Sequence, residues 1–300
     1  MGLMNVIMLW VTFLWAANAV ACKFALRGFS PMALAELRVV GAALGFWIVF
    51  LAVRGWPRLH FSRRDWFWMG LLALNGVTLN QASYMGGLSR TSVAHTALIV
   101  ALGPILVLVL AWLLHMESLS TAKALGMVTA FAGVAVLAAG RPSAGASWLG
   151  DMIMLGGRAA FAYYTILLKQ GAERYDPLAL NAVTFTLGAV LLVPFSARAL
   201  LHTTEASWTG VPPHAWLALA YMVILGTVVT YLLYAFALTV MTASHAAAFS
   251  YLAPVITIAL GVWLLSESIT GRVWAGGAMI LLGLVFTGQG LREGRGVDVQ

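Results

Sequence analysis

The chain has 300 residues, of which 62% are hydrophobic and only 9% are charged, whereas about a quarter of the residues of a soluble domain are charged. So few charged side chains cannot cover a water-exposed surface, and the composition therefore indicates an integral membrane protein. The net charge of +7 does not favour nucleic acid as a partner, because the basic residues are scattered at the ends of apolar runs. The single cysteine, Cys22, excludes a disulfide framework and a multi-cysteine metal site.

A helix needs about 20 apolar residues to cross a bilayer. In chain order, the sequence predicts transmembrane helices over residues 3–22, 32–53, 66–88, 94–114, 122–139, 149–169, 178–197, 214–238, 245–265 and 273–290. The first is expected to be retained rather than cleaved, because no charged segment and no small-residue cleavage site accompany it. The connections between the helices are too short to hold a catalytic domain.

Lys and Arg are more frequent in the connections that lie on the same side as the N-terminus, and residues 54–65 contribute half of the basic residues on that side. Because positively charged loops stay in the cytoplasm, we expect both termini to be cytoplasmic. The expected location is the inner (cytoplasmic) membrane, with the lipid bilayer as the surroundings of a multi-pass protein.

The two halves of the chain repeat one another. At an offset of 150 residues the identical pairs include His95 and His245, Pro104 and Pro254, Glu117 and Glu267, Gly126 and Gly276, and Gly133 and Gly283. Nearer the start of each half the offset is 146 residues, as for Lys23 and Lys169. The sequence therefore predicts two five-helix repeats, residues 1–140 and 141–290, followed by a short cytoplasmic tail, 291–300.

Five is an odd number of crossings, so the second repeat must enter the membrane from the opposite side. The expected fold class is thus an all-α membrane protein with ten transmembrane helices, arranged as two inverted five-helix repeats around a central cavity. Inverted repeats are typical of secondary transporters, which hold substrate near the middle of the membrane. A duplication that only builds a stable bundle is the alternative.

The residues that resemble a known family are Trp15, Asn18, Lys23, Pro31, Arg38, Pro104, Glu117, Gly126 and Gly133, together with the Glu-x-Leu/Ile-Ser/Thr signature at 117–120 and 267–270. The chain resembles the EamA-type ten-helix members of the drug/metabolite transporter superfamily, and among them the YddG-like amino-acid exporters most. It departs from their pattern at Ala16, where the family often has Gly, and at Arg158, a cation in a span that is normally apolar. The resemblance implies export of small metabolites, with amino acids favoured.

The third predicted span is the most polar, and its repeat partner is polar at matching positions. The side chains are Asn80, Gln81 and Tyr84 in the third span, and Thr227, Thr230, Tyr231 and Tyr234 in the eighth. Because polar groups avoid lipid, we expect these two stripes to form opposite walls of the central cavity. Hydrogen bonding between helices is the alternative.

Further candidates for the substrate lining come from other spans. They are Trp15, Asn18, Tyr164, Ser250 and Tyr251, with Arg158 near the middle of the sixth span. Arg158 either holds a substrate carboxylate or extends its side chain to the membrane interface.

Two pairs of repeated residues lie in the fourth and ninth spans. A histidine lies near the start of each span, and a proline lies within it. His95 and His245 are either hydrogen-bonded structural residues or groups that titrate near neutral pH. Pro104 and Pro254 each remove a backbone donor, so each is expected to kink its helix, either as a fixed bend or as a hinge.

The remaining repeated residues are expected to be structural. Glu117 and Glu267 are expected to lie in turns. Ser120 and Thr270 are expected to cap the helix that follows each turn. Gly126 and Gly133 are expected to be sites of close helix packing.

These observations favour a secondary transporter that exports small amphipathic metabolites, amino acids and aromatic ones among them, from the cytoplasm by alternating access. Alternatives are a multidrug or other metabolite exporter coupled to protons, a channel, and an intramembrane enzyme. An enzyme is disfavoured because no clustered nucleophile and base and no acidic pair are found. We expect no catalytic residues, no metal, no cofactor and no obligatory protein partner.

Overall fold

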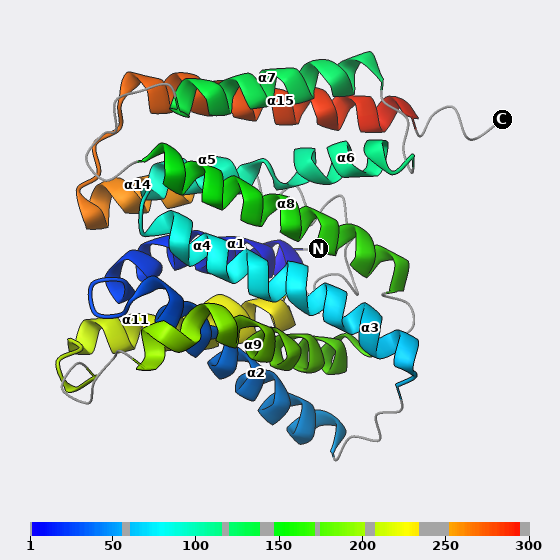
Figure 1. The fold of residues 1–300 in the computed structure, drawn as a ribbon. Coiled ribbons are helices and arrows are strands. Elements are labelled where there is room, and N and C mark those ends of the chain that lie inside the picture. Colours follow the sequence, from blue (N-terminus) through cyan, green and yellow to red (C-terminus); the bar gives the residue numbers. More distant parts are fainter. Residues whose placement is uncertain are drawn as a thin grey trace.

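The computed structural model describes residues 2–55, 61–115, 120–138, 147–171, 175–201, 208–233 and 252–294, and these residues form a bundle of helices stacked in layers (Figure 1). The helices are α1 Gly2–Ala25, α2 Pro31–Arg54, α3 Arg63–Leu72, η1 Ala73–Leu79, α4 Asn80–Leu88, α5 Val93–Ala101, α6 Gly103–Leu113, α7 Thr121–Ala138, α8 Trp148–Gly171, α9 Pro177–Leu201, α11 Pro213–Val223, η2 Ile224–Val229, α14 Ala253–Leu265 and α15 Gly271–Gly294.

The helices coincide with the predicted spans wherever the structure describes the chain. Four described segments are long and apolar enough to cross a membrane on their own, namely Asn5–Ala25, Pro31–Arg54, Leu178–Leu201 and Pro213–Leu233. Residues 94–114, predicted as one span, are instead two helices, α5 and α6, bent by 41° at the break that precedes Ile105. Pro104 lies at this break, in the first turn of α6, where its missing N–H and its ring oppose a continuous helix.

Side-chain caps fix several helix starts. Ser120 accepts a hydrogen bond from the backbone N–H of Lys123 at 3.3 Å, and Thr270 accepts one from Val273 at 3.4 Å. Both caps confirm the sequence prediction and satisfy backbone donors that an α-helix leaves unpaired.

The two repeats run antiparallel, as an inverted repeat requires. Helices α7 and α15 occupy equivalent places in the two repeats and lie side by side (Figure 1). A Cβ atom added at Gly133 would lie 2.7 Å from the carbonyl oxygen of Gly276, and one added at Gly283 would lie 2.5 Å from that of Gly126. Rising residue numbers on α7 therefore meet falling numbers on α15, and the predicted role of these glycines in close packing is confirmed.

Helices α2 and α9, a second equivalent pair, show the same direction. Ser196 donates to Glu36 at 2.8 Å, and the indole N–H of Trp47 donates to Thr186 at 2.9 Å. Again the higher residue on one helix meets the lower residue on the other.

Large apolar side chains face outward along the bundle. The exposed fraction is 78% for Trp263, 73% for Leu217 and 71% for Phe67. An outer surface of this kind is suited to lipid rather than to water.

Candidate substrate site

The polar spans of the two repeats contain matching π-helical turns. In the third span η1 joins α3 to α4, and in the eighth span η2 follows α11. The 150-residue offset maps residues 224–229 of η2 onto residues 74–79 of η1. A π-helical turn widens the helix by one residue and is frequent at functional sites.

Both turns are packed against equivalent residues of the opposite repeat. A Cβ atom added at Gly76 would collide with the ring of Tyr164, and one at Gly226 would lie 2.6 Å from Oδ1 of Asn18. Asn18 and Tyr164 are themselves related by the 146-residue offset. The predicted lining residues Asn18 and Tyr164 therefore each touch the π-helical turn of the opposite repeat.

Arg38 joins these elements from α2. Its Nη1 atom donates to Oε1 of Gln81 at 3.3 Å, and its Nε and Nη2 atoms lie 3.4 and 3.2 Å from Oγ1 of Thr227. The side chain is buried, with an exposed fraction of 7%. One cation thus connects the polar stripe of the first repeat to that of the second.

Arg158 approaches the same cluster from α8. Its guanidinium donates to Oδ1 of Asn80 and lies 4.8 Å from the centre of the Phe161 ring. Tyr84 and Tyr231, one from each polar stripe, lie near it, as does Arg38. The side chain is therefore directed to α4 and into the bundle.

Aromatic side chains complete the cluster. The ring of Tyr231 lies 6.2 Å from that of Trp15 and 6.0 Å from those of Phe46 and Phe185, in edge-on geometry. Tyr84, Tyr164 and Tyr231 are half-buried, whereas Trp15 is exposed. We call the cluster of Arg38, Arg158, Asn18, Asn80, Gln81, Tyr84, Tyr164, Thr227 and Tyr231 the central polar cluster.

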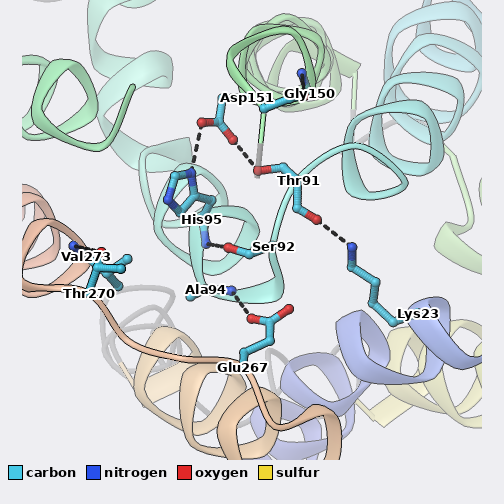
Figure 2. A network of polar contacts seen from close by, with 11 residues as sticks. Lys23, Thr91, Ser92, Ala94, His95, Gly150, Asp151, Glu267, Thr270 and Val273 are labelled. Atoms are coloured by element: carbon cyan, nitrogen blue, oxygen red, sulfur yellow. Dashed lines mark hydrogen bonds and ion pairs between the residues drawn. The ribbon is translucent and has the colours of Figure 1, made fainter. Parts of the chain in front are cut away.

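A second polar network lies at the end of the bundle where α5 and α8 begin (Figure 2). Asp151 accepts a hydrogen bond from the Thr91 hydroxyl at 2.5 Å, and its other oxygen lies 2.9 Å from Nδ1 of His95. Ser92 caps α5 by accepting from the backbone N–H of His95 at 3.0 Å. All four side chains are buried.

The same network fastens the two repeats together. Asp151, from the second repeat, bonds to Thr91 and His95 of the first. Within the first repeat, Lys23 of α1 donates to the backbone carbonyl of Thr91 at 2.5 Å. Glu267, which follows α14, accepts from the backbone N–H groups of Val93 at 2.9 Å and Ala94 at 3.2 Å. A carboxylate at this position satisfies unpaired donors and complements the positive end of the α5 dipole. We call these contacts the end latch.

The predicted site residues thus divide into two groups. Asn18, Asn80, Gln81, Tyr84, Arg158, Tyr164 and Tyr231 come together in the central polar cluster, with Trp15 against it, whereas His95 belongs to the end latch. Pro254 lies in the first turn of α14. Tyr234, His245, Ser250 and Tyr251 lie outside the described residues.

Sequence reasoning did not select Arg38, Lys23 or Asp151 as site residues. Arg38 carries the same signal as Arg158, because a cation well inside an apolar span costs about 2.5–3.5 kcal/mol to insert unless it is partnered. Asp151 gave no comparable signal, because it lies one turn inside α8 and its partners Thr91 and His95 are distant in the sequence.

Comparisons with known proteins agree with this architecture. Residues 2–139 and 148–289 each match the EamA-like transporter family. An uncharacterized transporter of Archaeoglobus fulgidus is 26% identical over 91% of this chain and 93% of its own length. The uncharacterized transporter YwfM of Bacillus subtilis is 27% identical over 91% and 89% of the two chains. A solved crystal structure with 20% identity superimposes with a TM-score of 0.64 over 97% of this chain and 98% of that one.

The antiparallel two-repeat fold and its apolar surface define a multi-pass helical membrane protein of the transporter class. The chain belongs to the EamA-like transporter family, within the drug/metabolite transporter superfamily. The family and the names of the relatives are those of transporters rather than enzymes.

Proposed function

We propose that the protein exports small amphipathic metabolites, amino acids and aromatic ones among them, from the cytoplasm by alternating access. In this proposal the substrate binds at the central polar cluster, and both termini lie on the cytoplasmic side of the inner membrane. The observation that carries the proposal is the convergence of polar side chains from both repeats on two equivalent π-helical turns.

Several features of the cluster support a role beyond packing. Tyr84, Tyr164 and Tyr231 combine ring surface with hydroxyl groups, and this combination suits a ligand that has an apolar body and polar ends. All three side chains are half-buried, so each keeps some surface that a ligand can contact.

The end latch supports alternating access. Lys23 and Glu267 join α1 and α14 to the start of α5, and Asp151 joins α8 to the same segment. If one repeat rocks against the other, the contacts of Asp151 and Glu267, which join the second repeat to the first, must break at this end, whereas the Lys23–Thr91 contact lies within the first repeat. A buried set of specific contacts can therefore hold one discrete conformation.

Counterflow in proteoliposomes tests the proposal. Vesicles are loaded with an unlabelled amino acid, and uptake of a labelled one is followed without and then with a pH gradient. We expect uptake that saturates and that other amino acids compete for, with phenylalanine among the effective competitors.

The other outcomes separate the alternatives. Uptake that does not saturate would indicate a channel, and a chemically altered substrate inside the vesicles would indicate an enzyme. No counterflow with any of the amino acids would contradict the assignment, and counterflow with cationic drugs would then favour a multidrug exporter. A response to the pH gradient would indicate proton coupling.

A further inference from the structure

Among the residues that the structure describes, the two cations of the central polar cluster have only neutral partners. Arg38 contacts Gln81 and Thr227, and Arg158 contacts Asn80 and an aromatic ring. The two guanidinium groups also repel each other electrostatically. Amide and hydroxyl oxygens satisfy some of the N–H donors, but they supply no negative charge to offset two cations inside spanning helices.

The acidic side chains that the structure describes are engaged elsewhere. Glu36 is bonded to Ser196, Asp65 and Asp176 cap the starts of α3 and α9, and Asp151 and Glu267 belong to the end latch. Glu36 and Arg38 are only two residues apart on α2, so they do not share a helix face. The sequence of residues 234–251, between η2 and α14, contains neither Asp nor Glu. A counter-charge for the two arginines must therefore be sought outside these parts of the chain.

A buried acceptor of the same cluster also lacks a donor. Oδ1 of Asn18 makes no hydrogen bond within the described part of the chain, and the residue is only 6% exposed. It lies against Gly226, the residue before the Thr227 hydroxyl that Arg38 contacts. The side chain of Asn18 is hydrogen-bonded to Tyr84, and Tyr84 lies near both arginines, so all these groups belong to one neighbourhood.

We infer that Arg38 and Arg158 together bind a carboxylate of the transported substrate, and that the Asn18 carbonyl accepts a hydrogen bond from the substrate's ammonium group. The guanidinium fork matches the two oxygens of a carboxylate and is weakly hydrated, so it suits this role in an apolar setting. The inference rests on the proposed transport function and narrows its substrates to compounds with a carboxylate, zwitterionic amino acids above all. Organic cations without a carboxylate are excluded, because two guanidinium groups repel them.

Binding to the purified wild-type protein in detergent tests the inference without any variant. The probes are phenylalanine, 3-phenylpropionate, which lacks the ammonium, and phenethylamine, which lacks the carboxylate. Affinity is measured from thermal stabilisation against probe concentration. We expect phenylalanine to bind best, 3-phenylpropionate to bind more weakly, and phenethylamine to bind at least about tenfold more weakly than phenylalanine, a ratio that corresponds to the loss of one charged contact.

Variants then assign the effect to the two arginines. Arg38→Gln and Arg158→Gln should each weaken phenylalanine binding at least about tenfold, and Arg→Lys at either position should restore part of it, because charge is kept without the fork. Arg272→Gln is the matched control, since Arg272 is an exposed arginine in the first turn of α15. Size-exclusion chromatography identifies any variant that fails to fold.

The outcomes separate this inference from the proposed function. Carboxylate-dependent binding that the Arg→Gln changes abolish, without any counterflow, would support the site and contradict amino-acid transport. Counterflow that phenethylamine inhibits as well as phenylalanine would support a transporter and overturn the inference. No carboxylate-dependent binding by the wild-type protein, across all the amino acids and their amines, would overturn it as well.

Discussion

A methyl group added at Gly76 would enter space that the ring of Tyr164 already fills. Overpacking of this kind costs about 1–3 kcal/mol, and here it would also displace a side chain of the central polar cluster. We therefore expect Gly76→Ala to lower both the Tm and the rate of counterflow.

Gly156→Ala in α8 is the matched control for this change, because a Cβ atom there meets no atom within 4 Å. Adding Tyr164→Ala to Gly76→Ala should restore part of the Tm, since it removes the ring that the methyl group meets. Equal Tm values and equal transport for Gly76→Ala and Gly156→Ala would contradict the close approach of η1 to α8.

Individual side chains also show where the sequence was and was not informative. Asn80, Gln81 and Tyr84 could be selected because each is polar in a span that must avoid lipid, and periodicity placed them on the interior. The contacts within the cluster could not be predicted, because Arg38, Gln81 and Thr227 lie on helices that are far apart in the sequence, and only the folded bundle brings them together. The pairing of Asp151 with His95 was not foreseen for the same reason.

At the scale of helices, α7 and α15 of the two repeats approach each other closely. Gly126, Gly133, Gly276 and Gly283 allow it, because the backbone carbonyls of one helix lie where a side chain of the other would stand. We expect Gly133→Ala and Gly283→Ala each to lower the Tm while leaving the KM for counterflow unchanged, since neither glycine contacts the central polar cluster.

Gly271→Ala is the control for α15, because a Cβ atom at Gly271 meets nothing within 4 Å. A change in KM without a change in Tm at Gly133 or Gly283 would contradict a purely structural role for this helix pair.

The end latch allows a test that uses the only cysteine of the chain. Cys22 is fully buried and immediately precedes Lys23 of the latch. Asp151→Asn removes the carboxylate that contacts both His95 and Thr91. Leaving a buried hydrogen-bonding group without its partner costs about 1–3 kcal/mol of the free energy that holds the latch closed. We expect the open population, and with it the rate of maleimide alkylation of Cys22, to rise about tenfold.

Asp65→Asn is the control for the latch, because Asp65 caps α3 at the opposite end of the bundle and contacts Tyr175 there. Alkylation of Cys22 that is equally slow in the wild-type protein and in Asp151→Asn would show that the latch does not limit opening of this end.

The helices themselves were largely predictable, whereas their interruptions were not. Apolar run length located the spans, and hydroxyl residues after Glu117 and Glu267 located two caps. The π-helical turns η1 and η2 have no comparable signature, because a single extra residue in a turn changes neither composition nor hydrophobic run length. The bend between α5 and α6 was foreseen from Pro104, but not that it would divide the span into two helices.

At the scale of the whole molecule, the sequence repeat makes the two ends of the bundle similar but unequal. The offsets map Asp151 onto Asn5 and His95 onto His245, so a neutral amide stands where the latch has a carboxylate. Oδ1 of Asn5 is buried and has no hydrogen-bond partner within the described residues. If the protein alternates between two conformations, the end that contains Asp151 should close more stably than the end that contains Asn5.

Asn5→Asp should reduce this inequality. By the sequence repeat, residue 5 corresponds to Asp151, so a carboxylate there should stabilise the conformation in which the Asn5 end is closed, as Asp151 stabilises the closed latch. A two-state equilibrium then shifts toward the conformation that is open at the latch. We therefore expect Asn5→Asp to speed alkylation of Cys22, although Cys22 lies at the opposite end of α1. Asn5→Gln keeps the amide and should leave the rate unchanged.

Faster alkylation in Asp151→Asn but not in Asn5→Asp would mean that the latch opens locally, without the rocking of one repeat against the other that alternating access requires.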